Sequence, residues 1–192
     1  RIYRRVPVLD NERTGENPWG VKFQTLFHMS NDSHLFFDSP APDRMPLYEA
    51  KMLYHFDHRF ATYEGATTAN INEGNLPQTT AEQKVDPSFA VQPRYWADRR
   101  EVDGRLSDWK PEWLLGFRRI ASGGNERTGI FSLLPKIGCG DSVFLLLPRQ
   151  GSATLVCALV GALNSLVFDY VVRQKMGGVN MSFYIVKQLP VL

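Results

Sequence analysis

The chain has 192 residues, of which 43% are hydrophobic and 22% are charged, and its formal net charge is +2. This composition is that of one ordinary domain with a buried core, and the charge is too mild to indicate nucleic-acid binding unless the cations are unevenly placed. The two cysteines, Cys139 and Cys157, exclude a disulfide framework and a zinc-cysteine site, which predicts a reducing, cytoplasmic location.

The N-terminal segment predicts short strands separated by polar turns. Residues 2–9 have a strand-like pattern with a basic patch, and residues 19–23 alternate apolar side chains with small or charged ones. Residues 39–46 are rich in proline and predict a loop without regular structure. The chain opens without an initiator methionine, so we expect it to be a piece of a longer polypeptide.

Residues 47–65, LYEAKMLYHFDHRFATYEG, combine an apolar pattern with clustered cations. The spacing fits a strand and a helix equally well, but a step of four residues returns to one face of either element. We therefore expect Lys51, His55 and Arg59 to form a basic row beside an aromatic layer, with Tyr63 at its end. Such a row suits the phosphates and bases of DNA. The alternative is an amphipathic element whose solvent face happens to be basic.

Two contrasting segments follow. Residues 66–84 are polar and poor in large apolar side chains, which predicts a long surface loop. Residues 94–119 mix arginines densely with three tryptophans. Such a mixture can stack on bases, or it can place the tryptophans in the core with solvated charges between them.

The C-terminal third has the clearest pattern. Residues 130–135 and 143–148 are short apolar runs typical of strands, with a turn at residues 137–141 between them. Residues 154–172 predict one helix that begins after Ser152. The helix is hydrophobic nearly all round, but polar side chains interrupt it. A buried core or subunit-contact helix is therefore expected, and no membrane span.

No catalytic constellation emerges from the motifs. Residues 138–141 resemble a glycine-rich loop that holds S-adenosylmethionine, but they run into a strand and not a helix, so we interpret them as a hairpin turn. Asp43 and Glu49 imitate the carboxylate pair of a metal-dependent nuclease, yet too few residues separate them for a strand and its return. His55 and His58 have metal-ligand spacing only on a helix. We expect neither a metal nor a cofactor in this chain.

Four blocks of sequence, residues 47–65, 94–96, 115–135 and 162–191, follow one another in a specific order. Together they resemble the C-terminal region of large bacterial adenine-specific DNA methyltransferases. These are single-chain type II restriction-modification enzymes and the related methylases of phage-defence systems such as DISARM and BREX. In this family the catalytic half, which binds S-adenosylmethionine, lies upstream. The resemblance therefore implies a target-recognition region that holds and reads double-stranded DNA and ends in helices packed against the catalytic domain.

The pattern and the resemblance together predict an α+β, largely β, fold. Residues 1–150 would form a β-rich DNA target-recognition domain, and residues 151–192 a helical packing segment of the same domain with a long buried helix. We expect no activity from this chain alone; its parent would be an S-adenosylmethionine-dependent methyltransferase, with or without an endonuclease. The alternative is a protein-interaction or scaffold domain of the same system that does not contact DNA.

The predicted DNA contacts follow from where the cations lie. Phosphates would be bound by Arg99, Arg100, Arg173 and Lys175, while base edges would be read from residues 51–63 and 118–128. Guanine contacts are predicted for three arginines, because only a guanidinium fork offers bidentate geometry. Those three are Arg118, Arg119 and Arg127. The complete predicted set is Lys51, His55, Arg59, Tyr63, Arg94, Tyr95, Arg99, Arg100, Arg118, Arg119, Asn125, Arg127, Thr128, Arg173 and Lys175.

Overall fold

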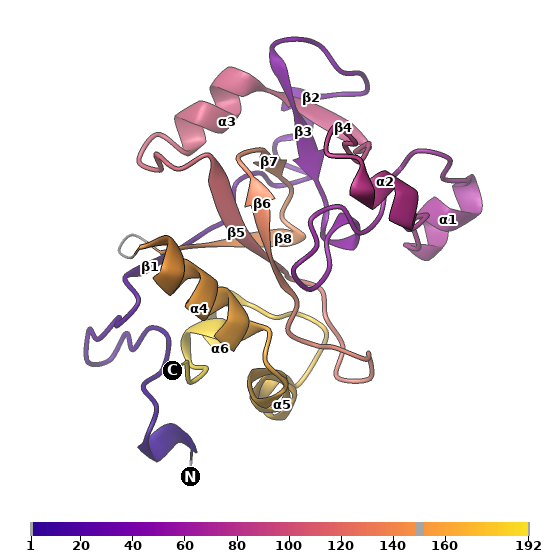
Figure 1. Cartoon of the computed structure of the whole chain (residues 1–192). Coiled ribbons are helices and arrows are strands. Elements are labelled where there is room, and N and C mark those ends of the chain that lie inside the picture. Colours follow the sequence, from indigo (N-terminus) through magenta and orange to yellow (C-terminus); the bar gives the residue numbers. More distant parts are fainter. Residues whose placement is uncertain (1, 149–151, 192) are drawn as a thin grey trace.

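The computed structural model describes residues 2–148 and 152–191 (Figure 1). The fold is α+β, as predicted, and is built on two four-stranded sheets. The first sheet, in the order β1-β8-β5-β6, contains β1 (Val21–Gln24), β5 (Trp113–Arg118), β6 (Phe131–Pro135) and β8 (Val143–Pro148). The second sheet, in the order β2-β4-β3-β7, contains β2 (Phe36–Phe37), β3 (Arg44–Tyr48), β4 (Tyr95–Asp98) and β7 (Gly138–Cys139).

Pairing differs between the two sheets. Neighbouring strands of the first sheet are antiparallel, with Gly116 of β5 opposite Leu145 of β8 and Ser132 of β6. In the second sheet β3 is antiparallel to β4 and parallel to β7. The predicted strands at residues 130–135 and 143–148 correspond to β6 and β8, and β1 lies in the segment predicted from residues 19–23.

The first sheet is buried on both faces, which explains its continuous apolar runs. Along β8, Val143, Leu145 and Leu147 join one hydrophobic core. The alternate residues, Phe144 and Leu146, join a second core on the opposite face. Because side chains alternate across a strand, a strand covered on both sides must be apolar at every position. The first sheet is therefore the middle layer of the molecule.

The second sheet and α3 (Arg99–Arg105) cover one face of the first sheet. Their core joins Leu47 of β3 and Ala97 of β4 to Leu114 of β5 and Leu134 of β6, all of which are buried. Figure 1 shows α3 above the strands on this side, at the end of the molecule away from the chain termini. The N-cap of α3 is Asp98, whose side chain accepts a hydrogen bond from the Arg100 amide.

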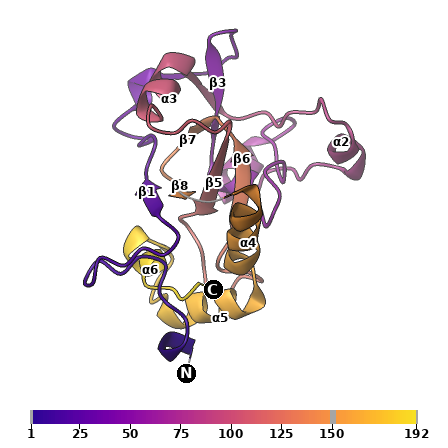
Figure 2. The same cartoon turned by 60° about the vertical axis from the view of Figure 1, so that its left-hand side comes forward.

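The C-terminal helices cover the other face of the first sheet (Figure 2). They are α4 (Ala153–Leu163), α5 (Leu166–Lys175) and α6 (Phe183–Lys187). Leu159 of α4 and Phe168 of α5 are buried in the core that holds Phe117 and Phe131 of the sheet. The rings of Phe131 and Phe168 meet edge to face with centroids 5.7 Å apart, a favourable aromatic geometry.

The single helix predicted for residues 154–172 is wrong, because α4 and α5 are separate helices bent by 56°. The break falls at Asn164 and Ser165. Ser165 caps α5 by accepting a hydrogen bond from the Phe168 amide, and the side chain of Asn164 binds the backbone of Phe131. In the part of the chain described, no single helix is long and apolar enough to span a membrane; only α4 and α5 taken together across their bend meet that criterion.

Three other predicted segments also differ. Residues 2–9 are not a strand but begin with a short 3-10 helix, η1 (Ile2–Arg4). Residues 39–46 were predicted to be a loop throughout, but β3 begins within them at Arg44. Proline lacks an amide hydrogen and cannot donate to a neighbouring strand. Pro46 is tolerated in β3 because pairing with β7 begins only at the next residue, Leu47. Residues 137–141 contain β7 and are not a simple hairpin turn.

The polar segment 66–84 is also more ordered than predicted, because it contains two short helices. These are α1 (Thr68–Glu73) and α2 (Ala81–Val85). Thr67 with Asn70, and Thr80 with Gln83, each form a capping box at the start of a helix. Neither helix buries a side chain. These helices are specified by their capping boxes and have no apolar face. A search for hydrophobic periodicity therefore could not predict them.

The contact of β5 with its neighbours predicts a stability difference between two glycines. A Cβ at Gly116 would lie 2.8 Å from Leu134 Cδ1 and 3.0 Å from Val143 Cγ1, whereas one at Gly161 in α4 meets nothing within 4 Å. Gly116→Ala should lower the free energy of unfolding by about 1–3 kcal/mol through overpacking. Gly161→Ala should raise it by about 0.5–1 kcal/mol through helix propensity. Urea denaturation of both variants measures this, and equal effects would contradict the packing of β5.

Candidate functional site

The predicted basic row does not exist, because residues 47–65 form no continuous element. The strand β3 ends at Tyr48, a short 3-10 helix η3 spans Ala50–Met52, and a tight turn follows in which Tyr54 bridges Asp57. Without one helix or strand through the segment, side chains four residues apart are not brought to a common face. The three side chains of the row instead have separate partners.

Each of these side chains is engaged within the fold. The Lys51 ammonium lies 3.7 Å from a Glu49 carboxylate oxygen and 5.0 Å from the centre of the Tyr63 ring. The Tyr63 hydroxyl donates to the same carboxylate at 2.6 Å. The Arg59 guanidinium donates to three main-chain carbonyls, those of Lys84, Asp86 and Phe89. Arg59 thus fastens the α2 segment to the body and is not free for phosphate.

His55 belongs to the same turn and contacts a distant loop. Its Nε2 lies 2.8 Å from the carbonyl oxygen of Gly129, which can only accept, so Nε2 carries the proton. Burial lowers the pKa of His55, which keeps the imidazole neutral in this position. The next residue, Phe56, donates its amide to the carbonyl of Phe131 at 3.3 Å. The turn is therefore held against the residues that precede and begin β6.

Phe56 is unusual in two respects. Its φ of 58° lies in the left-handed region, and it is the only non-glycine residue with positive φ in the described part of the chain. Its side chain is 63% exposed. A large side chain in this conformation costs free energy that a glycine would avoid. A left-handed backbone does not favour phenylalanine, and an exposed ring adds nothing to the hydrophobic core, so the fold does not explain a phenylalanine at this position.

Two of the three predicted guanine-reading arginines are used inside the molecule. Arg118 donates through Nε and Nη2 to the carbonyl of Leu53, at 2.9 and 2.6 Å. Arg127 donates to the carbonyl of Asn164, and its Nε is buried without a hydrogen-bond partner among the described residues. The structure does not support the bidentate guanine contact predicted for either, because the bonded donors of both face backbone carbonyls. Arg119 pairs with Asp141 at 3.1 Å and is partly exposed.

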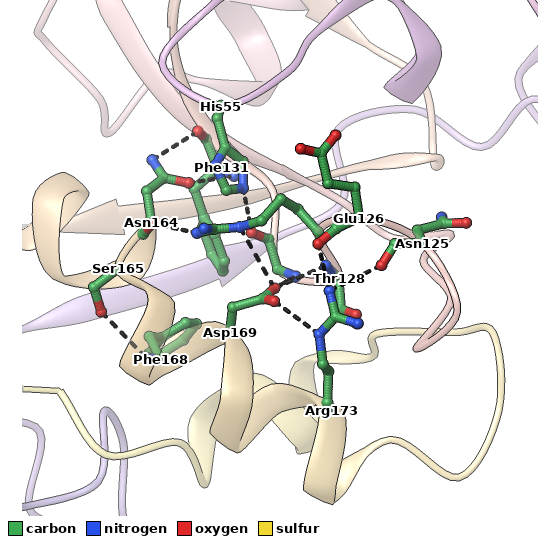
Figure 3. A network of polar contacts seen from close by, with 12 residues as sticks. His55, Asn125, Glu126, Thr128, Phe131, Asn164, Ser165, Phe168, Asp169 and Arg173 are labelled. Atoms are coloured by element: carbon green, nitrogen blue, oxygen red, sulfur yellow. Dashed lines mark hydrogen bonds and ion pairs between the residues drawn. The ribbon is translucent and has the colours of Figure 1, made fainter.

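The centre of the C-terminal half is the Asp169 carboxylate of α5 (Figure 3). Its side chain is 6% exposed. It accepts hydrogen bonds from the amides of Thr128 and Gly129 at 2.7 and 2.8 Å and from Nε of Arg173 at 2.9 Å. A buried carboxylate is stable only when several donors replace its lost water, as these three do.

Arg173 extends this network to an exposed loop, residues 122–128. Its guanidinium donates to the main-chain carbonyls of Gly123, Asn125 and Glu126. The Thr128 hydroxyl closes the loop by donating to the carbonyl of Ser122 at 3.1 Å. The backbone of the 122–128 loop is thus bound at both ends and along its length.

The side chains of this loop divide into buried and free groups. Thr128, in the predicted DNA-binding set, is fully buried and cannot contact DNA through its side chain. Asn125 and Glu126 are exposed, and Figure 3 shows both side chains directed away from the network around Asp169. The loop therefore presents one amide and one carboxylate to solvent on a fixed backbone.

The electrostatics of Asp169 follow from its donors. Burial alone would raise the pKa of Asp169, but the amides of Gly129 and Thr128 and the guanidinium of Arg173 outweigh it and hold this pKa below its ordinary value. The carboxylate is therefore ionised at neutral pH. A second cation, Arg127, lies 4.0 Å away from the same carboxylate.

The predicted DNA contacts outside the loop and the turn lie at two ends of the molecule. Arg94, Tyr95, Arg99 and Arg100 belong to β4 and α3 or adjoin them, far from α5 in Figure 1. Arg94 lies over the Tyr95 ring, and Arg100, 89% exposed, pairs with Asp98 at 3.0 Å. Lys175 lies at the C-terminal end of α5. One flat duplex contact across the whole predicted set is not supported by this arrangement.

The sequence did not identify some residues near α5 as functional. Asp169 and Asn164 were visible only as polar interruptions of an apolar helix. Tyr3 was not singled out, yet the Lys175 ammonium lies 5.4 Å from the centre of its ring, beside the exposed Arg4 and Arg5. In the described ranges, no group of three or more His, Cys, Asp and Glu residues is placed to hold a metal ion.

The Asp169 network predicts a pH-dependent stability. Asp169→Asn should lower the free energy of unfolding at pH 7 by about 3 kcal/mol, because it removes one partner of a buried charge pair. Because folding lowers the pKa of Asp169, its contribution is full above its unfolded pKa of about 3.9 and is lost as the pH falls through its lower folded pKa. Urea denaturation should therefore show the difference between parent and variant narrowing as the pH falls below about 3.9, the ordinary pKa of an aspartate.

Asp141→Asn is the matched control, because Asp141 forms a more exposed ion pair with Arg119. It should cost less than about 1 kcal/mol at any pH. Equal losses from Asp141→Asn and Asp169→Asn would contradict the central place of Asp169.

Comparison of the sequence with known proteins assigns no function to this site. No protein-family model matches the chain, and no curated protein sequence matches it. The resemblance to adenine-specific DNA methyltransferases therefore stays a prediction, and any function must be inferred from the geometry of the chain itself.

Proposed function

We propose that the chain is the DNA target-recognition module of an adenine-specific DNA methyltransferase, and that the 122–128 loop reads base edges. The observation that carries this proposal is the loop itself. Its backbone is fixed by buried Asp169 and half-buried Arg173, while Asn125 and Glu126 are free at its surface. A reading element needs this combination, because a rigid backbone lowers the entropy lost when side chains bind.

The two free side chains have the chemistry of major-groove recognition. An asparagine amide can bond to N6 and N7 of adenine at once, and a glutamate carboxylate can accept from N4 of cytosine. Asn125 was among the predicted contacts, and Glu126 was not. In this proposal the arginines Arg127 and Arg173 hold the loop in place and do not themselves read bases.

In this proposal the phosphates are bound by three cations near the C-terminal end of α5, namely Arg4, Arg5 and Lys175. Arg4 and Arg5 in or next to η1 are exposed, and the Lys175–Tyr3 contact brings them to the end of α5. None of these three cations forms an ion pair with a carboxylate of the described residues. Cations free of protein carboxylates are available for the sequence-independent part of DNA binding.

Phe56 adds an apolar contact to the same proposal. The turn that contains Phe56 is held next to the 122–128 loop, because His55 binds the carbonyl of Gly129, the residue that follows the loop. An exposed aromatic ring can stack on a base or enter a base step, which suits a phenylalanine that the fold itself does not require. The strained backbone of Phe56 is then a cost accepted for binding.

The remaining parts of the enzyme are proposed to lie elsewhere. Methyl transfer and S-adenosylmethionine binding would belong to a catalytic domain of the same polypeptide, acting in the cytoplasm on an adenine turned out of the duplex. The exposed side chains of Leu166, Val167 and Tyr170 on α5 would pack against that domain.

A second candidate function is a protein-interaction module without DNA contact. The same apolar side chains of α5 favour it, because they are 62–74% exposed. Beside them lies a pocket of about 300 Å³ lined mostly by apolar residues, among them Ile2, Val6 and Val167. Exposed apolar surface of this kind marks protein contacts.

The reading role of the loop predicts a loss of sequence preference in Asn125→Ala. A preferred duplex would first be selected from a random pool by this chain, and binding to it and to point-changed duplexes would be measured by fluorescence anisotropy. Asn125→Ala should weaken the preferred duplex by about 1–3 kcal/mol and bind its point-changed forms as the parent does. Lys175→Ala should weaken all duplexes alike.

Asn72→Ala is the control, because Asn72 is an exposed asparagine on α1, away from the loop in Figure 1. It should bind like the parent chain. If the parent chain binds no duplex at low salt, and Leu166→Ser abolishes its binding to a purified catalytic domain, the second candidate replaces the first.

The substitution Phe56→Gly should lower DNA affinity without lowering the stability of the fold, so it tests the two roles of Phe56 separately. Glycine accepts a φ of 58° without strain, so the free energy of unfolding should stay level or rise by up to about 1 kcal/mol. Duplex affinity should fall about tenfold, since a stacked base contributes about 1–3 kcal/mol. Phe56→Tyr should keep the affinity. Unchanged affinity in Phe56→Gly would remove Phe56 from the DNA surface.

A further inference from the structure

Arg118 at the end of β5 is a half-buried cation without a counter-ion. Two of its donors share the carbonyl of Leu53, and no carboxylate of the described residues pairs with it. Burial lowers the pKa of Arg118 from its ordinary value. A guanidinium that has lost water and gained no negative partner favours an anion nearby.

A pocket of about 310 Å³ lies beside Arg118, on the side of η3 and the α1–α2 segment. Its lining includes a second cation, Lys51, and no carboxylate. Lys51 is only partly neutralised, because Glu49 lies 3.7 Å away and also accepts from the Tyr63 hydroxyl. The two cations make this pocket electropositive.

One wall of the pocket is aromatic. The rings of Tyr54 and Phe60 are stacked with centroids 4.8 Å apart, and both line the pocket. The Arg118 guanidinium lies 5.3 Å from the centre of the Tyr54 ring, which fixes its orientation. The lining also includes two residues with side-chain amides, Asn75 and Gln78, from the segment after α1.

We infer that this pocket, named here the Arg118 pocket, binds one nucleotide unit. The phosphate would lie between Lys51 and Arg118, and the base would contact the aromatic pair and meet the amides with its edge. Cations, an aromatic wall and edge-binding amides together match the three parts of a nucleotide, whereas a bare phosphate would use only the cations. The volume is within the range of small-ligand sites.

The nucleotide has two sources, a free nucleotide or one nucleotide of an unpaired DNA strand. The inference rests on the proposed function only for the second source. The Arg118 pocket shares no residue with the 122–128 loop, so a negative result for one site does not contradict the proposal for the other.

The test measures binding of AMP, adenosine, inorganic phosphate and a short single-stranded dA oligonucleotide to the full chain by isothermal titration. AMP should bind, and adenosine and phosphate should each bind more weakly. Lys51→Met keeps the side-chain stem and should weaken AMP by about tenfold, the loss of one charge-assisted contact. Phe60→Leu should weaken AMP and leave phosphate binding unchanged.

Lys110→Met is the matched control, because Lys110 is exposed and does not line the Arg118 pocket. It should bind AMP like the parent. Lys51-dependent binding of the oligonucleotide, competed by AMP, identifies a DNA strand as the source; binding of AMP without the oligonucleotide identifies a free nucleotide. If neither binds, or if Lys51→Met and Lys110→Met behave alike, the inference is overturned, whatever Asn125→Ala does to duplex binding.

Discussion

The buried carboxylate of Asp169 is the interaction on which the C-terminal half of the molecule depends. A charge this far from water is tolerated only when hydrogen-bond donors surround it, and these come from the 122–128 loop, its flank and Arg173. The same requirement fixes the position of α5 against the loop. The bend of 56° between α4 and α5 accompanies this docking, because it lies directly before the helix that carries Asp169.

Several arginines of the described residues bind the backbone of the chain itself. Arg59, Arg118, Arg127 and Arg173 all donate to main-chain carbonyls. The segments they bind lie outside the sheets or at their ends, where carbonyls lack a strand partner. A guanidinium carries five donors in a fixed fork, so one side chain can satisfy several such carbonyls. An arginine-rich sequence therefore indicates irregular backbone here as much as it indicates an anionic partner.

The elements predicted correctly are those specified by local apolar pattern. The strands at β6 and β8 and the cap at Ser152 depend on neighbouring residues only. The errors occurred where a partner distant in sequence decides the conformation. The row through Lys51, His55 and Arg59 failed because the segment turns back at Tyr54 and Asp57. Periodicity cannot reveal such a turn when it contains no glycine or proline.

The sequence by itself determined that the chain folds as α+β, that the apolar runs 130–135 and 143–148 form strands, and that polar residues interrupt the C-terminal helical region. It also contained the candidate chemistry: arginines, amides and aromatic residues in one chain of mild charge. Only the tertiary structure decided which of these side chains are free. Arg127 and Asn125 are two residues apart, yet Arg127 is half-buried with its guanidinium bonded to the Asn164 carbonyl, and Asn125 is exposed. The physical reason is that availability depends on contacts across long sequence separations, such as those of Asp169 and Arg173 with the 122–128 loop, which no local pattern encodes.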